Sequence, residues 1–206
     1  MLNKYARAFV TTILAPVARL LLRLGVSPDV VTVVGTIGVS FGALYFYPRG
    51  ELWWGTLFIT AFVFTDLLDG TMARLSGRTT SWGAFLDSTL DRIGDGAVFG
   101  GLVLYFAGRG DHDLNAALAL TCLILGFVTS YSKARAESLN FTCDVGIAER
   151  ADRLVAVLVT TGFVGLFLPM WVLTTVLALL ALASLITVLQ RIFTVRAQAL
   201  GRRVGP

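Results

Sequence analysis

The chain has 206 residues, of which 56% are hydrophobic and only 15% are charged, with a formal net charge of +4. A soluble domain carries about 25% charged residues, so this composition excludes an ordinary water-soluble protein, and we expect no nucleic-acid partner. A bilayer core takes roughly 20 apolar residues per helix. Six spans and a short interfacial segment fit this length, and we predict one membrane domain over residues 1–206.

The N-terminal segment predicts an amphipathic helix over residues 1–25 that lies on the membrane surface. Between residues 2 and 24, apolar side chains recur at three- and four-residue spacings, the pattern of a helix with one apolar face. Pro16 is expected to bend or break it. The basic residues that interrupt the apolar pattern are Lys4, Arg7, Arg19 and Arg23. A simple cytosolic arm is the alternative, and we expect no cleaved signal peptide because the three-part pattern is missing.

Six apolar runs follow and predict a six-helix bundle over about residues 30–192. Ser27 precedes Pro28, a start signal for a helix with proline at its first position. The runs cover residues 30–47, 52–68, 84–107, 114–132, 153–168 and 170–192. The predicted fold class is therefore an all-α integral membrane protein with six transmembrane helices after the amphipathic helix.

The distribution of basic residues predicts the orientation of the bundle. Six crossings put both termini on one side, and only Arg49 and Arg109 then fall in loops on the other side. Basic residues collect on the cytoplasmic side of membrane proteins. We therefore expect a multi-pass protein of the cell membrane whose polar ends face the cytoplasm.

Acidic residues cluster at the predicted cytosolic ends of the second and third runs. The cluster comprises Asp66, Asp69, Asp87 and Asp91, and Asp95 follows one helical turn later. A carboxylate at membrane depth is costly and is normally retained for function. Positions 66, 69, 70, 73 and 74 share one helical face, as do positions 83, 87, 91 and 95 on the next helix. The short loop between these helices makes them antiparallel neighbours, so the two acidic stripes are able to converge.

Several carboxylates so close together repel one another unless a cation lies among them. Oxygen ligands without histidine or thiolate favour magnesium, calcium or manganese over zinc. Two such ions about 4 Å apart would suit a displacement at phosphorus. Gly70, Ala73 and Gly83 lie on the same faces and leave room for a bulky ligand, and Arg74 is placed to reach a phosphate.

The acidic cluster could also have a structural or a transport role. The aspartates could form structural ion pairs with Arg74 and Arg92, or they could line the pathway of a small transporter or cation channel. A pathway should spread its carboxylates through the membrane, whereas these lie near one predicted face. Asp95 could pair with a basic residue or line an acceptor pocket.

Residues 66–91 reproduce in full the pattern D-x2-D-G-x2-A-R-x8-G-x3-D-x3-D, and by it the chain resembles the CDP-alcohol phosphotransferases. The six-helix layout and the amphipathic start extend the resemblance to nearly the whole chain. It implies that an alcohol displaces CMP from a CDP-linked lipid such as CDP-diacylglycerol. It also implies a homodimer with two metal ions per protomer, for which we expect Mg²⁺ with Mn²⁺ possible.

The resemblance also implies roles for individual residues. Asp66, Asp69 and Asp87 match metal ligands, and Asp91 matches a ligand of the second ion that also serves as general base. The residues implied to bind the nucleotide of CDP-diacylglycerol are Asp29, Val30, Val31, Thr32, Gly70, Ala73, Arg74, Thr80 and Gly83. Asp29 and Thr32 could instead do no more than begin a helix.

Basic residues at three predicted helix ends indicate an acceptor that already carries a phosphate. Lys133 ends the fourth run, Arg153 opens the fifth and Arg191 closes the sixth. Nearby Arg150 and Arg196 could be ordinary cytosolic flanking charges.

The identity of the acceptor follows from a narrower resemblance. Residues 132–137 and 149–153 are similar to segments of the actinobacterial phosphatidylinositol-phosphate synthases. That similarity implies inositol 1-phosphate (1D-myo-inositol 3-phosphate) as the acceptor. Glycerol 3-phosphate, which would give phosphatidylglycerol phosphate, is the close alternative, because both are phosphorylated alcohols.

Overall fold

A computed structural model describes residues 14–77 and 80–201, without the side chain of Asp66. These residues form helices and loops and contain no β-strand. Residues 14–23 are helical. The elements that follow are α2 (Pro28–Phe46), the 3₁₀ turn η1 (Tyr47–Arg49), α3 (Leu52–Val63), α4 (Thr65–Ser76), α5 (Ser81–Ala107), α6 (Asp113–Ser138), α7 (Arg150–Leu166) and α8 (Met170–Gly201).

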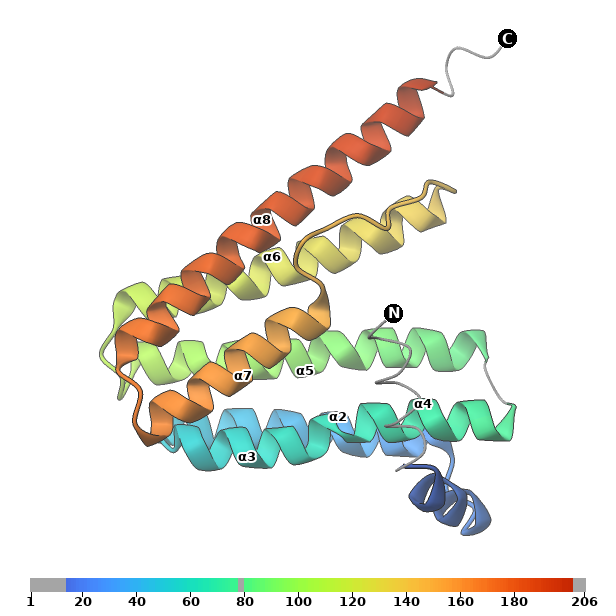
Figure 1. Cartoon of the computed structure of the whole chain (residues 1–206), viewed down its shortest axis with the longest axis horizontal. Coiled ribbons are helices and arrows are strands. Elements are labelled where there is room, and N and C mark those ends of the chain that lie inside the picture. The colour runs from blue at the N-terminus through green and yellow to red at the C-terminus, as the bar shows by residue number, and fades with distance from the viewer. Residues whose placement is uncertain (1–13, 78–79, 202–206) are drawn as a thin grey trace.

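From α2 onward, the described helices form six rods, because α4 continues the line of α3 (Figure 1). Each rod matches one predicted apolar run. Within the part of the chain that the structure describes, four stretches are long and apolar enough to cross a bilayer, namely Pro28–Arg49, Leu52–Ser76, Asp113–Ser138 and Met170–Gly201. In α5, charged residues occupy the first half of the helix, and α7 has only 17 residues. The chain is thus a multi-pass membrane protein, while six crossings stay a prediction.

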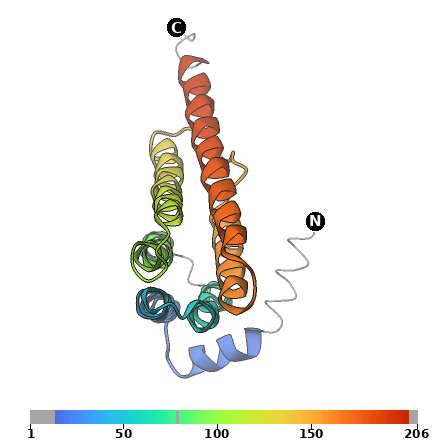
Figure 2. The same ribbon diagram turned by 90° about the vertical axis from the view of Figure 1, so that its left-hand side faces the viewer.

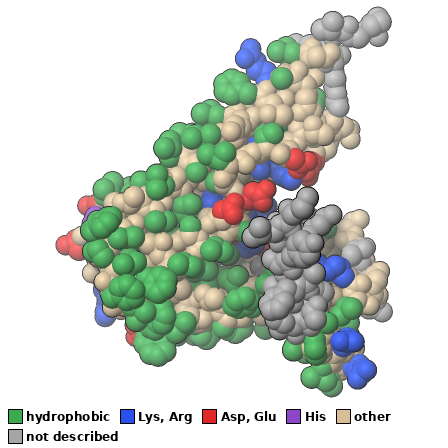
Figure 3. Space-filling model, viewed as in Figure 1, with side chains coloured by type: hydrophobic (Ala, Val, Ile, Leu, Met, Phe, Trp, Pro, Cys, Tyr) green, Lys and Arg blue, Asp and Glu red, His purple; other side chains and the backbone are tan. Residues whose placement is uncertain are grey.

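The rods form two groups that diverge toward one end of the molecule. α2 packs against α3 and α5, α6 runs beside α8, and α7 lies against α3 and α8. Toward their C-terminal ends α6 and α8 rise away from α4 and the start of α5 (Figure 1). In Figure 3, acidic and basic side chains gather where this upper arm leaves the rest of the molecule, and hydrophobic side chains cover much of the remaining visible surface.

The two loops with the outlying basic residues meet at the opposite end of the bundle. Arg109 Nη1 donates a hydrogen bond to the carbonyl oxygen of Arg49, at 2.9 Å. The acidic stretches of α4 and α5 lie at the other end (Figure 1). This arrangement agrees with the charge asymmetry on which the predicted orientation depends.

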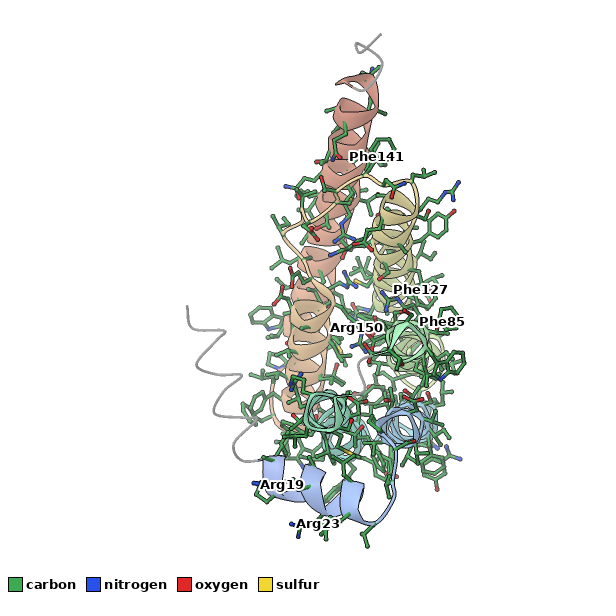
Figure 4. The ribbon with its side chains drawn as sticks, turned by 90° about the vertical axis from the view of Figure 1, so that its right-hand side faces the viewer. Arg19, Arg23, Phe85, Phe127, Phe141 and Arg150 are labelled. Atoms are coloured by element: carbon green, nitrogen blue, oxygen red, sulfur yellow. The ribbon has the colours of Figure 1, made fainter. Side chains whose placement is uncertain are left out.

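The helix over residues 14–23 runs nearly perpendicular to α2, beneath one end of the bundle (Figure 2). Ala18 is fully buried and packs with Val31 and Met72, which fixes this helix against α2 and α4. Arg19 and Arg23 point away from the bundle (Figure 4). The first half of the predicted amphipathic helix lies outside the described residues, so its place at the membrane surface stays a prediction.

Glycine lets α2 and α5 approach closely. A Cβ atom added at Gly101 would lie 2.5 Å from the carbonyl oxygen of Ala43, whereas one added at Gly100 would meet nothing within 4 Å. We expect Gly101→Ala to lower the free energy of unfolding by about 1–3 kcal/mol, because the two backbones must move apart. Gly100→Ala is the matched control and should be neutral or stabilising. Thermal unfolding in detergent measures both, and equal melting temperatures would contradict the close contact.

Candidate active site

A cleft of about 270 Å³ opens where the start of α2, the middle of α4 and the start of α5 meet. It is lined by Pro28, Asp29, Thr32, Asp69, Gly70, Ala73, Thr80, Gly83, Ala84 and Asp87. Three separate stretches of the sequence therefore supply one cavity. It lies at the end of the bundle opposite the Arg49 and Arg109 loops.

Local helix signals position these residues. Ser27 Oγ accepts a hydrogen bond from the amide of Val30 and begins α2, and Thr80 Oγ1 accepts one from the amide of Gly83 and begins α5. Gly77 ends α4 with a positive φ of 64°, a conformation that glycine adopts without strain. α4 and α5 both pack against α2, and each supplies one carboxylate to the cleft, Asp69 from α4 and Asp87 from α5.

The cleft brings together eight of the predicted site residues. They are Asp29, Thr32, Asp69, Gly70, Ala73, Thr80, Gly83 and Asp87. Val30 and Val31 do not line it: Val30 is exposed, and Val31 is buried against Ala18. Asp66 lies on α4, but its side chain is outside the described part of the structure.

Arg74 lies at the border of the cleft. Its Nη2 donates a hydrogen bond to Thr71 Oγ1 at 3.1 Å, and its Nη1 is 3.4 Å from the position of a Cβ atom at Gly70. Thr71 is buried, so it holds the guanidinium beside the cleft wall. The reach of Arg74 toward a phosphate stays a prediction.

Small residues keep the cleft open, and enlarging one of them should close it. We expect Ala73→Leu to weaken the binding of a cytidine nucleotide by about tenfold or more, because overpacking of this size costs about 1–3 kcal/mol. Ala107→Leu at the far end of α5, where the side chain is exposed, is the control. Binding of CMP to the purified protein measures both, and equal affinities would contradict a nucleotide in this cleft.

Asp91 does not line this cleft and instead borders a separate cavity of about 10 Å³ with Thr36, Gly94 and Arg150. Arg150 Nη1 lies 2.9 Å from Asp91 Oδ1, and Arg150 Nε donates to Asp95 Oδ1 at 3.1 Å. Arg92 Nη1 lies 3.5 Å from Asp91 Oδ2, so the ion-pair alternative holds in part. Arg150 is thus more than a flanking charge. The spacing of Asp91 and Asp95, one turn apart on α5, is the sequence feature that could have indicated a shared basic partner.

The three cations predicted to bind an acceptor phosphate lie in one region but in different surroundings. Arg153 is 3% exposed and donates to the carbonyl oxygen of Ala148 at 3.1 Å. Arg191 is 8% exposed and donates to the carbonyl oxygens of Thr129 and Val145. Arg191 does not close the last helix, because α8 continues to Gly201. Lys133 is partly exposed.

The loop between α6 and α7 contacts all three cations, which the sequence did not predict: Arg153 and Arg191 donate to its carbonyl oxygens, and Lys133 pairs with Asp144. Thr187 Oγ1 accepts hydrogen bonds from the amides of Ile147 and Ala148, and the Gln198 side chain exchanges hydrogen bonds with Thr142. Lys133 Nζ lies 2.6 Å from Asp144 Oδ1, and this ammonium lowers the pKa of Asp144. The loop is therefore tied to α6 and α8 along its length.

The donor set of the cleft fits a hard divalent cation. Asp69 and Asp87 contribute carboxylates to one cavity, Thr32 and Thr80 contribute hydroxyls, and none of the described residues that line it is a histidine or cysteine. Oxygen donors of this kind suit magnesium or manganese. Among the described side chains no group of three or more candidate ligands converges. The carboxylate of Asp66, which the sequence pattern adds to the set, is not among them.

Comparison with known proteins connects this site to a family. The family model for CDP-alcohol phosphatidyltransferase matches residues 25–187. The phosphatidylinositol phosphate synthase of Streptomyces avermitilis is 55% identical over 210 residues, covering 97% of this chain and 84% of that protein. The protein of the same name from Mycobacterium tuberculosis is 44% identical over 192 residues, covering 92% of this chain and 88% of that protein.

Two solved structures of the Mycobacterium tuberculosis synthase have the same architecture. The structure with CDP-DAG bound superposes with a TM-score of 0.85 at 45% identity, covering 89% of this chain and 94% of that chain. The structure in complex with manganese and citrate gives a TM-score of 0.82 at 45% identity, covering 88% of each chain. Together with the aspartate pattern of α4 and α5, these similarities lead to one conclusion: the chain belongs to the CDP-alcohol phosphatidyltransferase family.

Proposed function

We propose that this protein is a phosphatidylinositol phosphate synthase, a metal-dependent membrane enzyme. It transfers the phosphatidyl group of CDP-diacylglycerol to inositol 1-phosphate (1D-myo-inositol 3-phosphate) and releases CMP. One observation carries the proposal: Asp69, Asp87 and the small residues of the family pattern line one cleft, in a chain 55% identical to a protein with that name.

The cleft residues would hold the donor. Asp29, Thr32, Thr80 and the small residues Gly70, Ala73 and Gly83 would surround the cytidine, and Arg74 would bind its phosphates. Val30 and Val31 would support the start of α2 without touching the nucleotide. Asp66, Asp69, Asp87 and Asp91 would hold two divalent ions, Mg²⁺ or Mn²⁺. When bound, such ions neutralise the charge of a diphosphate and polarise its phosphorus–oxygen bonds.

Asp91 would accept the proton of the acceptor hydroxyl, whose oxygen attacks the β-phosphorus as the bond to CMP breaks. A carboxylate is a weak base for an alcohol, so positioning of the two substrates must supply much of the rate. The site is suited to this because Asp87 and Asp91 are one turn apart on α5. Helix α5 therefore carries both a residue that lines the donor cleft, Asp87, and the proposed base, Asp91.

Lys133, Arg153 and Arg191 would bind the phosphate of the acceptor. Arg153 and Arg191 are buried and both donate to carbonyl oxygens of the loop between α6 and α7, and Lys133 pairs with Asp144 of the same loop. Cations held together in a largely buried region are stabilised by an anion. A phosphorylated alcohol supplies that anion as a phosphate, whereas free inositol is uncharged and serine is a zwitterion without net charge.

The cellular setting completes the proposal. Residues 1–206 would form one domain with six transmembrane helices, and residues 1–25 would lie at the membrane surface. The active site would face the cytoplasm. The opposed placement of the Arg49 and Arg109 loops supports this orientation. A homodimer with two ions per protomer follows from the family pattern, and light scattering of the detergent-solubilised protein would test the dimer.

The decisive experiment is CMP release by the purified protein with CDP-diacylglycerol and Mg²⁺. Inositol phosphate, glycerol 3-phosphate, free inositol and serine are offered separately. We expect release only with inositol phosphate. Release with glycerol 3-phosphate alone would keep the reaction and change the acceptor. No release with any of the four, from folded protein, would contradict the proposed function.

A further inference from the structure

Arg150 makes a bridge that belongs neither to the family pattern nor to the predicted acceptor group. It is the first residue of α7, and its guanidinium reaches two carboxylates one turn apart on α5. Nη1 lies 2.9 Å from Asp91 Oδ1, and Nε lies 3.1 Å from Asp95 Oδ1. Figure 4 shows Arg150 between α7 and α5. The side chain thus links these two helices at the level of the proposed general base.

The two acidic partners of Arg150 differ in exposure. The Asp95 side chain is 11% exposed and lies deeper in the bundle, whereas the Asp91 side chain is 18% exposed. Burial makes the loss of a charged partner costly for the group left behind. Asp95 therefore anchors Arg150, and Asp91 is the partner that a competing cation reaches more easily.

Arg150 and a divalent ion require the same atoms of Asp91. Arg150 approaches Oδ1 at 2.9 Å and Arg92 approaches Oδ2 at 3.5 Å. A magnesium ion binds carboxylate oxygens at about 2.0–2.1 Å, and a cation so close to a guanidinium would be repelled. The cavity beside Asp91 and Arg150 measures only about 10 Å³, so there is no space for a hydrated ion next to the arginine as it lies.

We propose that Arg150, anchored by Asp95, is a built-in substitute cation that occupies Asp91 in the metal-free protein and leaves that carboxylate when it takes a divalent ion. This inference rests on the proposed metal role of Asp91. Asp95 and Arg150 are then positioning residues: they keep Asp91 neutralised and in place until the site is loaded. The arginine stays in the site afterwards because its bond to Asp95 is kept.

The proposal predicts opposite effects for the two partners. Arg150→Gln removes the nearer of the two arginines at Asp91, so Mn²⁺ affinity should rise about tenfold or more, the factor that the loss of one hydrogen bond between charged groups gives. In Asp95→Asn, Arg150 loses the carboxylate of Asp95 but keeps that of Asp91. It should then hold Asp91 more firmly, so Mn²⁺ affinity should fall. Arg150→Lys keeps the positive charge, so its Mn²⁺ affinity should remain close to that of the unaltered protein. A purely structural bridge would weaken metal binding in both Arg150→Gln and Asp95→Asn.

The test uses the full-length protein in detergent, stripped of metal with a chelator and titrated with Mn²⁺. Free Mn²⁺ is followed by electron paramagnetic resonance, and the melting temperature is recorded with and without the ion. Arg150→Gln should melt lower than the unaltered protein when metal-free and gain more from Mn²⁺. Arg135→Gln, an exposed arginine near the end of α6, is the control and should change neither quantity.

The outcomes separate this inference from the function on which it rests. Wild-type or weaker Mn²⁺ binding by folded Arg150→Gln would overturn the substitute-cation proposal while leaving the metal role of Asp91 intact. Asp91→Asn should lose one bound ion per protomer, and unchanged binding there would overturn the metal role itself. Tighter binding in Arg150→Gln together with weaker binding in Asp95→Asn would support the proposal.

Discussion

Replacing Asp91 by asparagine is expected to lower the rate of CMP release by about 10²–10⁴-fold, the range for removal of a general base. Asparagine keeps the shape of the side chain but has neither the proton affinity nor the charge of the carboxylate. The loss should appear in kcat with saturating CDP-diacylglycerol and inositol phosphate. It should persist at high Mg²⁺ concentration if proton transfer is the main contribution of Asp91.

Asp113→Asn provides the matched control for this experiment. Asp113 is an exposed aspartate in the first turn of α6, at the end of the bundle away from the cleft. The same chemical change there should leave the rate unaltered. The proposed role of Asp91 would be wrong if the two variants had equal activity while both remained folded and bound Mn²⁺.

Arg191→Gln is expected to reduce kcat/KM for inositol phosphate by about 10–150-fold, the cost of one hydrogen bond to a charged group. Glutamine can still donate to a backbone carbonyl such as that of Val145, but it does not attract a phosphate. The KM for CDP-diacylglycerol should change little, because Arg191 does not line the donor cleft. Steady-state kinetics with each substrate varied in turn separate the two effects.

Arg196→Gln tests whether any positive charge on this part of α8 has the same effect. Arg196 lies on α8 beyond Arg191 and is exposed. The Arg196→Gln substitution should change neither the KM for inositol phosphate nor the KM for CDP-diacylglycerol. Equal losses in the two variants would indicate general attraction of an anionic substrate rather than a specific phosphate site.

The spacing of the aspartates made much of the donor site predictable. Asp69, Gly70 and Ala73 recur at helical intervals on α4, and Gly83 and Asp87 do so on α5. A fixed helical repeat converts sequence spacing directly into a shared face. The short turn at Gly77 then leaves antiparallel neighbours as the simplest arrangement, and the cleft agrees with it.

The long-range partner of Asp91, Arg150, could not be predicted in the same way, although the neighbouring Arg92 was. Arg150 is distant in the sequence, and the connection between α6 and α7 has no regular secondary structure. Where such a loop places the next helix depends on its own hydrogen bonds, here from the amides of Ile147 and Ala148 to Thr187 on α8. Spacing within one helix gives no information about these contacts.

By itself, then, the sequence determined the helical class, the acidic faces of α4 and α5 and the family pattern, because local periodicity and composition encode each of them. The tertiary structure alone decided that Arg150 bridges Asp91 and Asp95, that Arg153 and Arg191 are buried and donate to a loop, and that Val30 does not line the cleft. These features depend on side chains that meet across helices, where packing and the pairing of buried charges decide the partners.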